Sequence, residues 1–208
     1  MIPEETLSLF FAASVALALA PGPDNIFVLT QSALHGRAAG LHVTLGLCTG
    51  LLVHTAAVSL GVAAIFRTSD MAFTGLKSVG AMYLLYLAWQ AFRSGAADLE
   101  ENRDVNLSRR SLYARGVVMN ITNPKVAIFF LAFLPQFADP TRGSVTLQTL
   151  CFGGVFVVAT LLVFVSVALT AGFLGGWLKG SKRAQTAMNR VSGAVFAGMA
   201  LRLVVSER

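Results

Sequence analysis

The chain has 208 residues, of which 55% are hydrophobic and 12% are charged, and its mean hydropathy is +0.70. A water-soluble domain of this length carries about a quarter charged residues, so the composition argues against a soluble protein and favours the bilayer as solvent. The net charge of +6 does not indicate nucleic-acid binding, because the basic residues cluster between apolar segments, as they do in multi-pass membrane proteins.

Six apolar runs follow one another along the chain. A membrane-spanning helix needs about 20 mainly apolar residues, and the last of the six runs is shorter than that. The sequence therefore predicts an all-α integral membrane protein with six transmembrane helices, in a single transporter domain covering residues 1–208. The predicted spans are residues 6–34, 41–66, 71–92, 116–138, 143–178 and 191–205.

The basic residues predict the orientation of these helices. Three of the connections between spans lie on the same side of the membrane and carry ten basic residues. Cytoplasmic loops are enriched in Lys and Arg, so we expect this side to be cytoplasmic and both termini to be periplasmic. The ten residues are Arg37, Arg93, Arg103, Arg109, Arg110, Arg115, Lys179, Lys182, Arg183 and Arg190.

The first span contains the stretch LAPGPDNIFV, in which Pro21, Gly22 and Pro23 interrupt an apolar run. Proline has no backbone N–H and clashes with the carbonyl four residues earlier, so these prolines should free the carbonyls of Leu17 and Leu19. Proline also suits the first position of a helix, with Gly before it as the N-cap. The stretch therefore predicts a helix that stops and then restarts.

Polar side chains follow this break directly. Asp24 is the only charged residue between positions 6 and 34, and Asn25 comes next. Ionisable residues inside a membrane span are functional candidates by default. A new helix N-terminus favours a carboxylate, and freed carbonyls favour an ammonium group, so such a break suits a zwitterion. Gln31 follows within two turns and could line the same cavity.

The fourth span repeats the pattern with NITNPKVAIFF, where Pro124 should free the carbonyl of Asn120. Asn123 is the expected N-cap. Lys125 then falls in the first turn, where a cation opposes the helix dipole. Three explanations stay open for Lys125: a carboxylate partner such as Asp24, a substrate carboxylate, or a side chain that extends to water.

The order of features agrees between the two halves of the chain. Each half has a proline motif, an apolar segment, and then a small-residue helix containing a cysteine, LGLCTG or TLCFGG. Because each half has three spans, the second half must be inverted relative to the first. We therefore predict inverted three-helix repeats at about residues 1–93 and 116–208, joined by a cytoplasmic loop at about 94–115, with the first and fourth helices broken at the midplane.

Two stretches, PGPDNIFVLTQSALHGRAAGLHVTLGLCTG and NITNPKVAIFFLAFLPQF, also carry a resemblance. The chain resembles the LysE/RhtB superfamily of bacterial amino-acid exporters, whose homoserine/threonine/leucine exporters share a PGP-[ND] motif and an NPK motif running into P-Q-F. The resemblance covers the whole chain, including YLLYLAW in the third span. It implies a secondary transporter in the bacterial inner membrane that exports small amino acids or their derivatives, driven by the proton gradient.

Together these observations predict proton antiport by alternating access around the two broken helices. The substrate carboxylate would meet a helix N-terminus or Lys125, and its ammonium would meet freed carbonyls or Asp24. Asp24 is also the candidate proton carrier. The expected partners are a small amino acid, protons and lipid, with a homodimer as an open possibility and no nucleic acid.

Other function classes have less support in the sequence. A metal-ion exporter of the same superfamily would need ligands, but there is no His or Cys cluster. A thiol-redox carrier could use Cys48 and Cys151, which occupy similar places in the two repeats, although neither has a neighbour that would lower its pKa. An enzyme is not expected, because no nucleophile–base pair is apparent, and no cofactor is implied.

Overall fold

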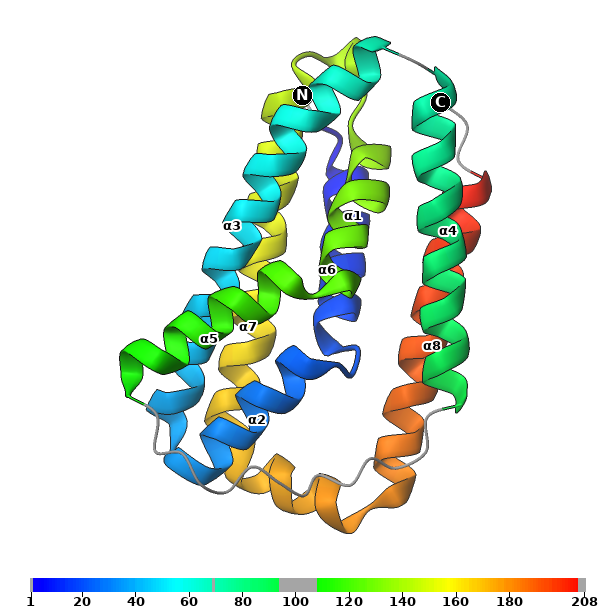
Figure 1. The fold of residues 1–208 in the computed structure, drawn as a ribbon. Helices are drawn as coiled ribbons and strands as arrows, with labels where there is room; N and C mark the ends of the chain where they lie inside the picture. The colour runs from blue at the N-terminus through cyan, green and yellow to red at the C-terminus, as the bar shows by residue number, and fades with distance from the viewer. Residues whose placement is uncertain (1, 69, 94–107, 206–208) are drawn as a thin grey trace.

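The computed structural model describes residues 2–68, 70–93 and 108–205, and every regular element in these ranges is helical (Figure 1). Two helices are long and apolar enough to cross a membrane, at Arg37–Gly61 and Val145–Ala171. Two bent helix pairs pass the same test when each pair is taken as one span. The all-helical membrane architecture is therefore confirmed with two to four spans, and the count of six stays a prediction.

The first break lies where the sequence predicts it. Helix α1 covers Glu4–Leu19, helix α2 covers Pro23–His35, and their axes are bent by 62°. Gly22 is the N-cap of α2 and Pro23 is its first residue. The missing N–H groups of the two prolines account for the end of one helix and the start of the next.

The second break follows the same chemistry but continues differently. Helix α5 (Arg109–Thr122) ends before the NPK motif, and the continuation from Pro124 to Phe137 is bent from it by 51°. Only α6 (Pro124–Ile128) is α-helical in this continuation. It passes into the π-helix η1 (Phe129–Phe133) and the 3₁₀-helix η2 (Leu134–Phe137), because Pro135 cannot donate the α-helical hydrogen bond to Leu131.

The remaining long helices are continuous, and two helices begin well before the predicted spans. Helix α5 begins at Arg109, ahead of the span predicted from 116, and α8 begins at Lys182, ahead of the span predicted from 191. Both early turns are rich in basic residues, so a count of apolar residues misses them. The continuous helices are α3 (Arg37–Thr68), α4 (Asp70–Arg93), α7 (Val145–Gly180) and α8 (Lys182–Val205), with a short 3₁₀-helix η3 at Pro140–Arg142.

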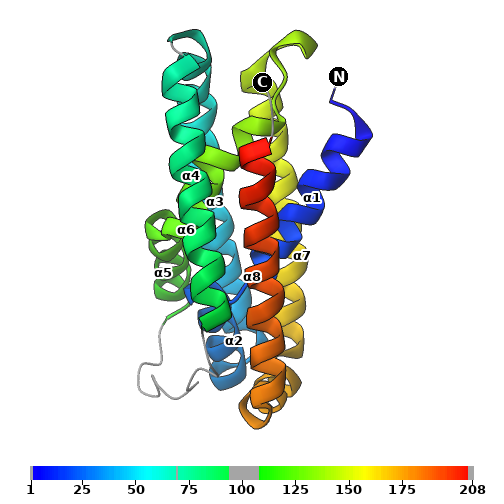
Figure 2. The same ribbon diagram turned by 90° about the vertical axis from the view of Figure 1, so that its right-hand side faces the viewer.

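Helix α3 is the centre of the packing and contacts α2, α5 and α7, whereas α4 packs mainly on α8 (Figure 2). Small residues allow α3 and α5 to approach closely. A methyl group added at Gly46 would lie 2.1 Å from the carbonyl oxygen of Tyr113, and one added at Gly116 would lie 2.5 Å from that of Val43. These glycines therefore allow close packing of α3 on α5 within the monomer. This packing holds α5 beside the first half of the chain.

Phenylalanine side chains fill the core between α1, the segment after α6, and α7. Phe10 contacts Phe129, Phe137 and Phe152 with ring centroids 4.9–5.8 Å apart.

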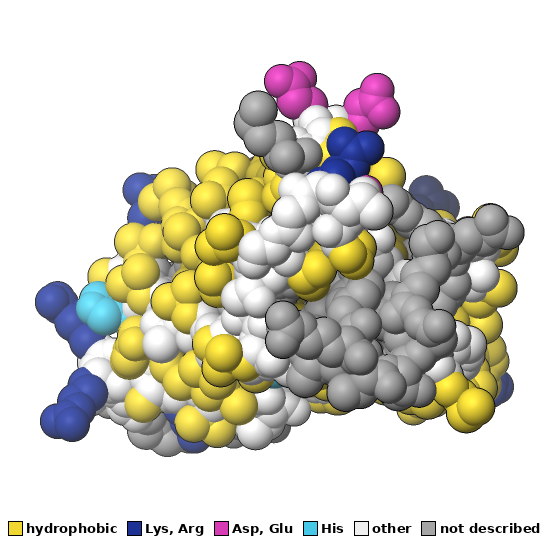
Figure 3. Space-filling view, turned by 90° about the horizontal axis from the view of Figure 1, so that it is seen from above, with side chains coloured by type: hydrophobic (Ala, Val, Ile, Leu, Met, Phe, Trp, Pro, Cys, Tyr) yellow, Lys and Arg dark blue, Asp and Glu magenta, His cyan; other side chains and the backbone are white. Residues whose placement is uncertain are grey.

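The outer surface is also apolar: Met71 is 84% exposed, and hydrophobic side chains cover much of the visible described surface (Figure 3). An exposed apolar surface of this kind fits contact with lipid.

The ends of the molecule differ in which segments they contain. The start of α1 and the end of α8 lie at the upper end, and the α2–α3 and α7–α8 junctions lie at the lower end (Figures 1 and 2). This matches the predicted grouping of termini and basic connections on opposite sides. Most of the predicted loop at 94–115 lies outside the described residues. Which end faces the cytoplasm stays a prediction.

Candidate functional site

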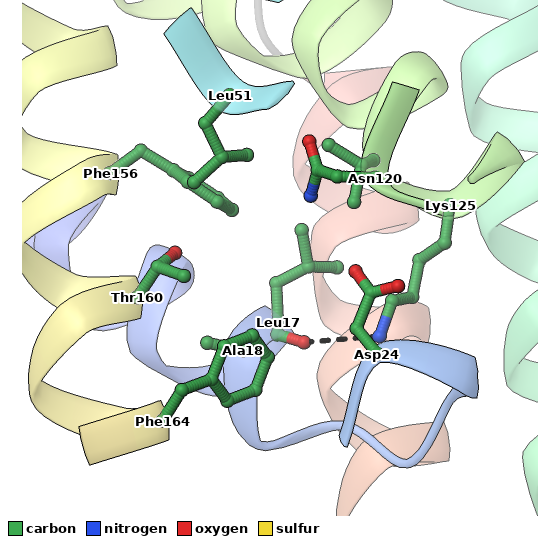
Figure 4. Close-up of a pocket in the computed structure, with 10 residues that line it drawn as sticks. Leu17, Ala18, Asp24, Leu51, Asn120, Lys125, Phe156, Thr160 and Phe164 are labelled. Atoms are coloured by element: carbon green, nitrogen blue, oxygen red, sulfur yellow. Dashed lines mark hydrogen bonds between the residues drawn. The ribbon is translucent and has the colours of Figure 1, made fainter. Parts of the chain in front are cut away.

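The two helix breaks meet through the side chain of Lys125. Its Nζ donates to the carbonyl oxygen of Ala20 at 3.0 Å and to that of Leu17 at 3.4 Å. Figure 4 shows the second of these bonds. Leu17 is one of the residues whose carbonyl the first proline motif was expected to free. Lys125 is only 8% exposed, so the suggested extension of its side chain to water is wrong. Its ammonium instead donates hydrogen bonds to the end of α1, in the other broken helix pair.

Electrostatics explain this placement. Lys125 lies in the first turn of α6, where the dipole of its own helix opposes a cation. Its ammonium reaches the C-terminal end of α1, where unpaired carbonyls make the potential negative. Gly22 leaves room for this contact, because a methyl group there would lie 3.0 Å from Nζ. The favourable contact of the ammonium with the end of α1 therefore compensates the unfavourable position of Lys125 at the start of α6.

Asp24 lies in the first turn of α2 and is 3% exposed. Its carboxylate points towards the Lys125 side chain (Figure 4), but the two residues form no ion pair within 4.0 Å. One carboxylate oxygen, Oδ1, is buried without a hydrogen-bond partner. The predicted partnership of Asp24 and Lys125 is thus a near approach that leaves the carboxylate able to accept a further donor.

The asparagines of the two motifs act partly as caps. Asn25 donates from Nδ2 to the carbonyl oxygen of Ala18 at 2.6 Å, so it satisfies another group at the end of α1. Asn123 is the N-cap of α6, as predicted, and its Oδ1 accepts from the backbone N–H of Lys125 at 3.0 Å. Its Nδ2 is buried without a partner.

The carbonyl that Pro124 frees, that of Asn120, is also capped across the molecule. The Nε2 of His54, on α3, lies 3.2 Å from this oxygen, and the carbonyl can only accept, so Nε2 carries the proton. The side-chain Oδ1 of Asn120 is buried and has no partner. His54 was not among the predicted site residues, although a histidine within an apolar span is the signal that could have identified it.

A small cavity of about 20 Å³ lies between the two breaks and α7. This volume holds about one water molecule and is smaller than any amino acid. Four polar side chains line it: Asp24, Asn120 and Lys125 come from the motifs, and Thr160 comes from α7 (Figure 4). The apolar wall is Leu17, Ala18, Leu51, Val126, Phe156 and Phe164.

Thr160 is the residue that sequence reasoning missed. Other buried hydroxyls in the described helices, such as those of Ser14, Thr44 and Thr55, donate to a carbonyl in the preceding turn. Thr160 is 2% exposed and its Oγ1 has no partner. Thr160 is the only hydroxyl residue between positions 151 and 165, which was the available signal. Gln31 is buried with Oε1 unpartnered, but it is not among the residues that line the cavity.

A metal-ion exporter would need a group of metal-ligating side chains, and a thiol-redox carrier would need its two cysteines. Among the described residues, no group of three His, Cys, Asp or Glu side chains could hold a metal ion. Cys48 is buried on α3 and Cys151 is exposed on α7, and both are free thiols.

The chain is similar to two efflux proteins and to a further membrane protein. It is 35% identical over 188 residues to the homoserine/homoserine lactone efflux protein of Salmonella typhimurium and to that of Salmonella typhi, covering 90% of each chain. It is 31% identical over 198 residues to a membrane protein of Vibrio cholerae, covering 95% of this chain and 96% of the relative. No solved structure matches it. Residues 15–207 match the LysE type translocator family, to which the chain therefore belongs.

Proposed function

We propose that the protein exports small amino acids, with homoserine and its close derivatives as the first candidates, across the bacterial cytoplasmic membrane. The names of the two Salmonella relatives support the substrate class. The family supports translocation. The cavity supports the location of the site, because it joins the two helix breaks and has polar groups that suit a zwitterion.

The observation that carries the proposal is a set of buried polar atoms without partners around one cavity. These are Asp24 Oδ1, Asn120 Oδ1 and Thr160 Oγ1. A buried polar group without a hydrogen bond costs about 1–3 kcal/mol, so three together are a substantial cost in an empty protein. A bound amino acid would offset it: its ammonium donates to the carboxylate and amide oxygens, and its polar atoms bond the hydroxyl.

The small size of the cavity requires a conformational change during transport. It is too small for an amino acid, so the protein must open to bind one, and it must open on either side in turn to release it. The two bent pairs are the natural positions for this movement, because the helical hydrogen-bond ladder is interrupted there. Alternating access between two inverted repeats, with both termini periplasmic, is the arrangement we propose.

Asp24 is proposed to couple this movement to protons. Its carboxylate is buried beside the substrate position and can hold either a proton or the substrate ammonium, but not both. Loading substrate from the cytoplasm would therefore release a proton there, and proton uptake from the periplasm would release the substrate. This exchange constitutes proton antiport.

The test is Asp24→Asn in liposomes containing the purified protein, with labelled homoserine. Asparagine keeps the size of the side chain but cannot titrate. If Asp24 carries the proton, uphill transport driven by a pH gradient should be lost while exchange of labelled for unlabelled homoserine persists. If Asp24 only binds the ammonium, both modes should weaken by about 10- to 150-fold, from the loss of a charge-assisted hydrogen bond.

Asp139→Asn is the matched control, because Asp139 is an exposed carboxylate that pairs with Arg142 and does not line the cavity. Both transport modes should be unchanged in this variant. Normal gradient-driven transport by Asp24→Asn would refute both roles of Asp24. A panel of labelled amino acids in the same liposomes identifies the substrate, and no transport of any member would refute the proposed function.

A further inference from the structure

The Lys125 ammonium occupies the position that the substrate ammonium would be expected to use. The end of α1 offers two carbonyl oxygens, and both accept hydrogen bonds from the same Nζ. The residue that supplies it lies more than a hundred positions away in sequence, on the other broken helix. Leu17 lines the cavity together with Asp24 and Lys125. The protein thus contains an ammonium group of its own next to the proposed substrate site.

We propose that Lys125 is a tethered substitute for the substrate. In the empty transporter its ammonium caps the carbonyls of Leu17 and Ala20, and an incoming amino acid displaces it and takes these carbonyls with its own ammonium. This inference rests on the proposed export function. It assigns Lys125 a role in the return of the empty transporter.

The cost of closing an empty site gives the physical reason. When the protein closes without substrate, the carbonyls at the end of α1 are enclosed away from water, beside the carboxylate of Asp24. Unpaired carbonyls in such a place are unfavourable, so an empty transporter would close rarely. The Lys125 ammonium supplies the missing hydrogen bonds. A cavity of only about 20 Å³ is the size expected in an empty transporter whose substrate site has contracted.

The geometry also allows the displacement. Lys125 has a long, flexible side chain, and its ammonium lines the cavity, so withdrawing it frees the two carbonyls and enlarges the cavity in one movement. The displaced ammonium keeps three donors, which water entering the opened cavity can accept. The same side chain would thus cap the carbonyls in one half of the cycle and leave them to the substrate in the other.

The first test is Lys125→Met, which keeps the length of the side chain and removes the charge. Two measurements in liposomes separate the steps, both with homoserine and at equal pH on the two sides. Net efflux requires the empty transporter to return, and counterflow of labelled for unlabelled homoserine does not. Net efflux should fall about tenfold or more, as expected from losing a charge-assisted cap, while counterflow stays within about threefold of wild type. Arg110→Met, which removes an exposed cation from α5, should change neither.

Gly22→Ala provides a second test that leaves the charge in place. The backbone of Gly22 is extended, with φ at −177°, so alanine fits there without strain. Its methyl group would lie 3.0 Å from Nζ and should push the ammonium off the carbonyls by a few tenths of an ångström. A weaker competitor should lower the homoserine concentration for half-maximal counterflow about two- to tenfold, and should slow net efflux.

The results for the Lys125→Met and Gly22→Ala variants either support or overturn the proposed role of Lys125. Equal loss of net efflux and counterflow in Lys125→Met, at normal abundance, would overturn the proposal, because Lys125 would then be a substrate ligand or a structural cap alone. Normal net efflux in that variant would also overturn it. If Lys125→Met does not accumulate, an unchanged half-maximal concentration in Gly22→Ala would have the same consequence. Absence of counterflow in the wild-type protein would instead refute the export function itself.

Discussion

The contact between α3 and α5 leads to a prediction about Gly46→Ala. Gly46 lies on α3, where a methyl group would come 2.1 Å from the carbonyl oxygen of Tyr113 on α5 and 3.0 Å from the Cα of Gly116. Both neighbours are backbone atoms, which cannot rotate away as a side chain can. The substitution therefore requires that the two helices separate, and α5 carries Asn120 of the candidate site at its other end.

The magnitude follows from these distances. Real Cβ atoms essentially never approach another atom closer than 3.0 Å, so α5 must retreat by about 3.0 − 2.1 = 0.9 Å. Overpacking of this kind costs about 1–3 kcal/mol, and we expect the upper end because backbone must move. For a protein of this size each kcal/mol shifts the unfolding midpoint by about 2–4 °C, so 3 kcal/mol lowers it by roughly 6–12 °C.

The assay is thermal unfolding of the purified protein in detergent micelles, followed by the fraction that remains monodisperse after heating. Gly154→Ala is the matched control, because the added methyl group at this α7 position meets nothing within 4 Å. Alanine is also the better helix former, by about 0.5–1 kcal/mol, so the control should be as stable as wild type or slightly more so. Equal midpoints for the two variants would show that α3 and α5 do not pack as closely as described.

Three further predictions concern regions outside the cavity. Hydrogen bonds from the Thr141 hydroxyl and N–H lower the pKa of Asp139, so they stabilise the loop above the ordinary carboxyl range and are lost as the pH falls through the lowered pKa. An NMR titration of the Thr141 amide should show this transition below the usual range, and Asp139→Asn should abolish it. Replacing Cys48 and Cys151 together by Ser should leave homoserine export intact, whereas a thiol carrier would lose all activity. Reporter fusions should place the C-terminus in the periplasm and the 94–115 loop in the cytoplasm, and a cytoplasmic C-terminus would contradict the proposed orientation.

The breaks were predictable from sequence because their cause is local. Pro21, Pro23 and Pro124 lack the N–H that the helix needs, whatever surrounds them. The starts of α5 and α8 were not predictable from apolar runs, because a helix can extend past the bilayer on charged residues. Ser108 does cap α5 by accepting from the N–H of Ser111, which is a local signal that hydropathy does not include.

The partners of the freed carbonyls were not predictable, because they come from distant parts of the chain. The sequence indicates that Leu17 should lose its helical hydrogen bond, but nothing local shows that Lys125 replaces it. The position of Lys125 against its own helix dipole did indicate that an outside partner was needed. Three explanations fitted that requirement, and the contact that the structure shows, with the carbonyls of Leu17 and Ala20, is not one of them.

The two caps are reciprocal, which explains how the breaks can persist in an apolar surrounding. Lys125, in the second half of the chain, caps carbonyls of the first break, and His54, in the first half, caps the Asn120 carbonyl at the second. Each half satisfies part of its own break, because Asn25 donates to the Ala18 carbonyl and the N–H of Asn123 donates to the Asn120 carbonyl. The caps from the opposite half add to these bonds, in a surrounding where each unpaired group would cost several kcal/mol. For the same reason a movement that withdraws one cap changes the contact between the halves, so the polar groups that stabilise the fold are also placed to respond when the cavity opens.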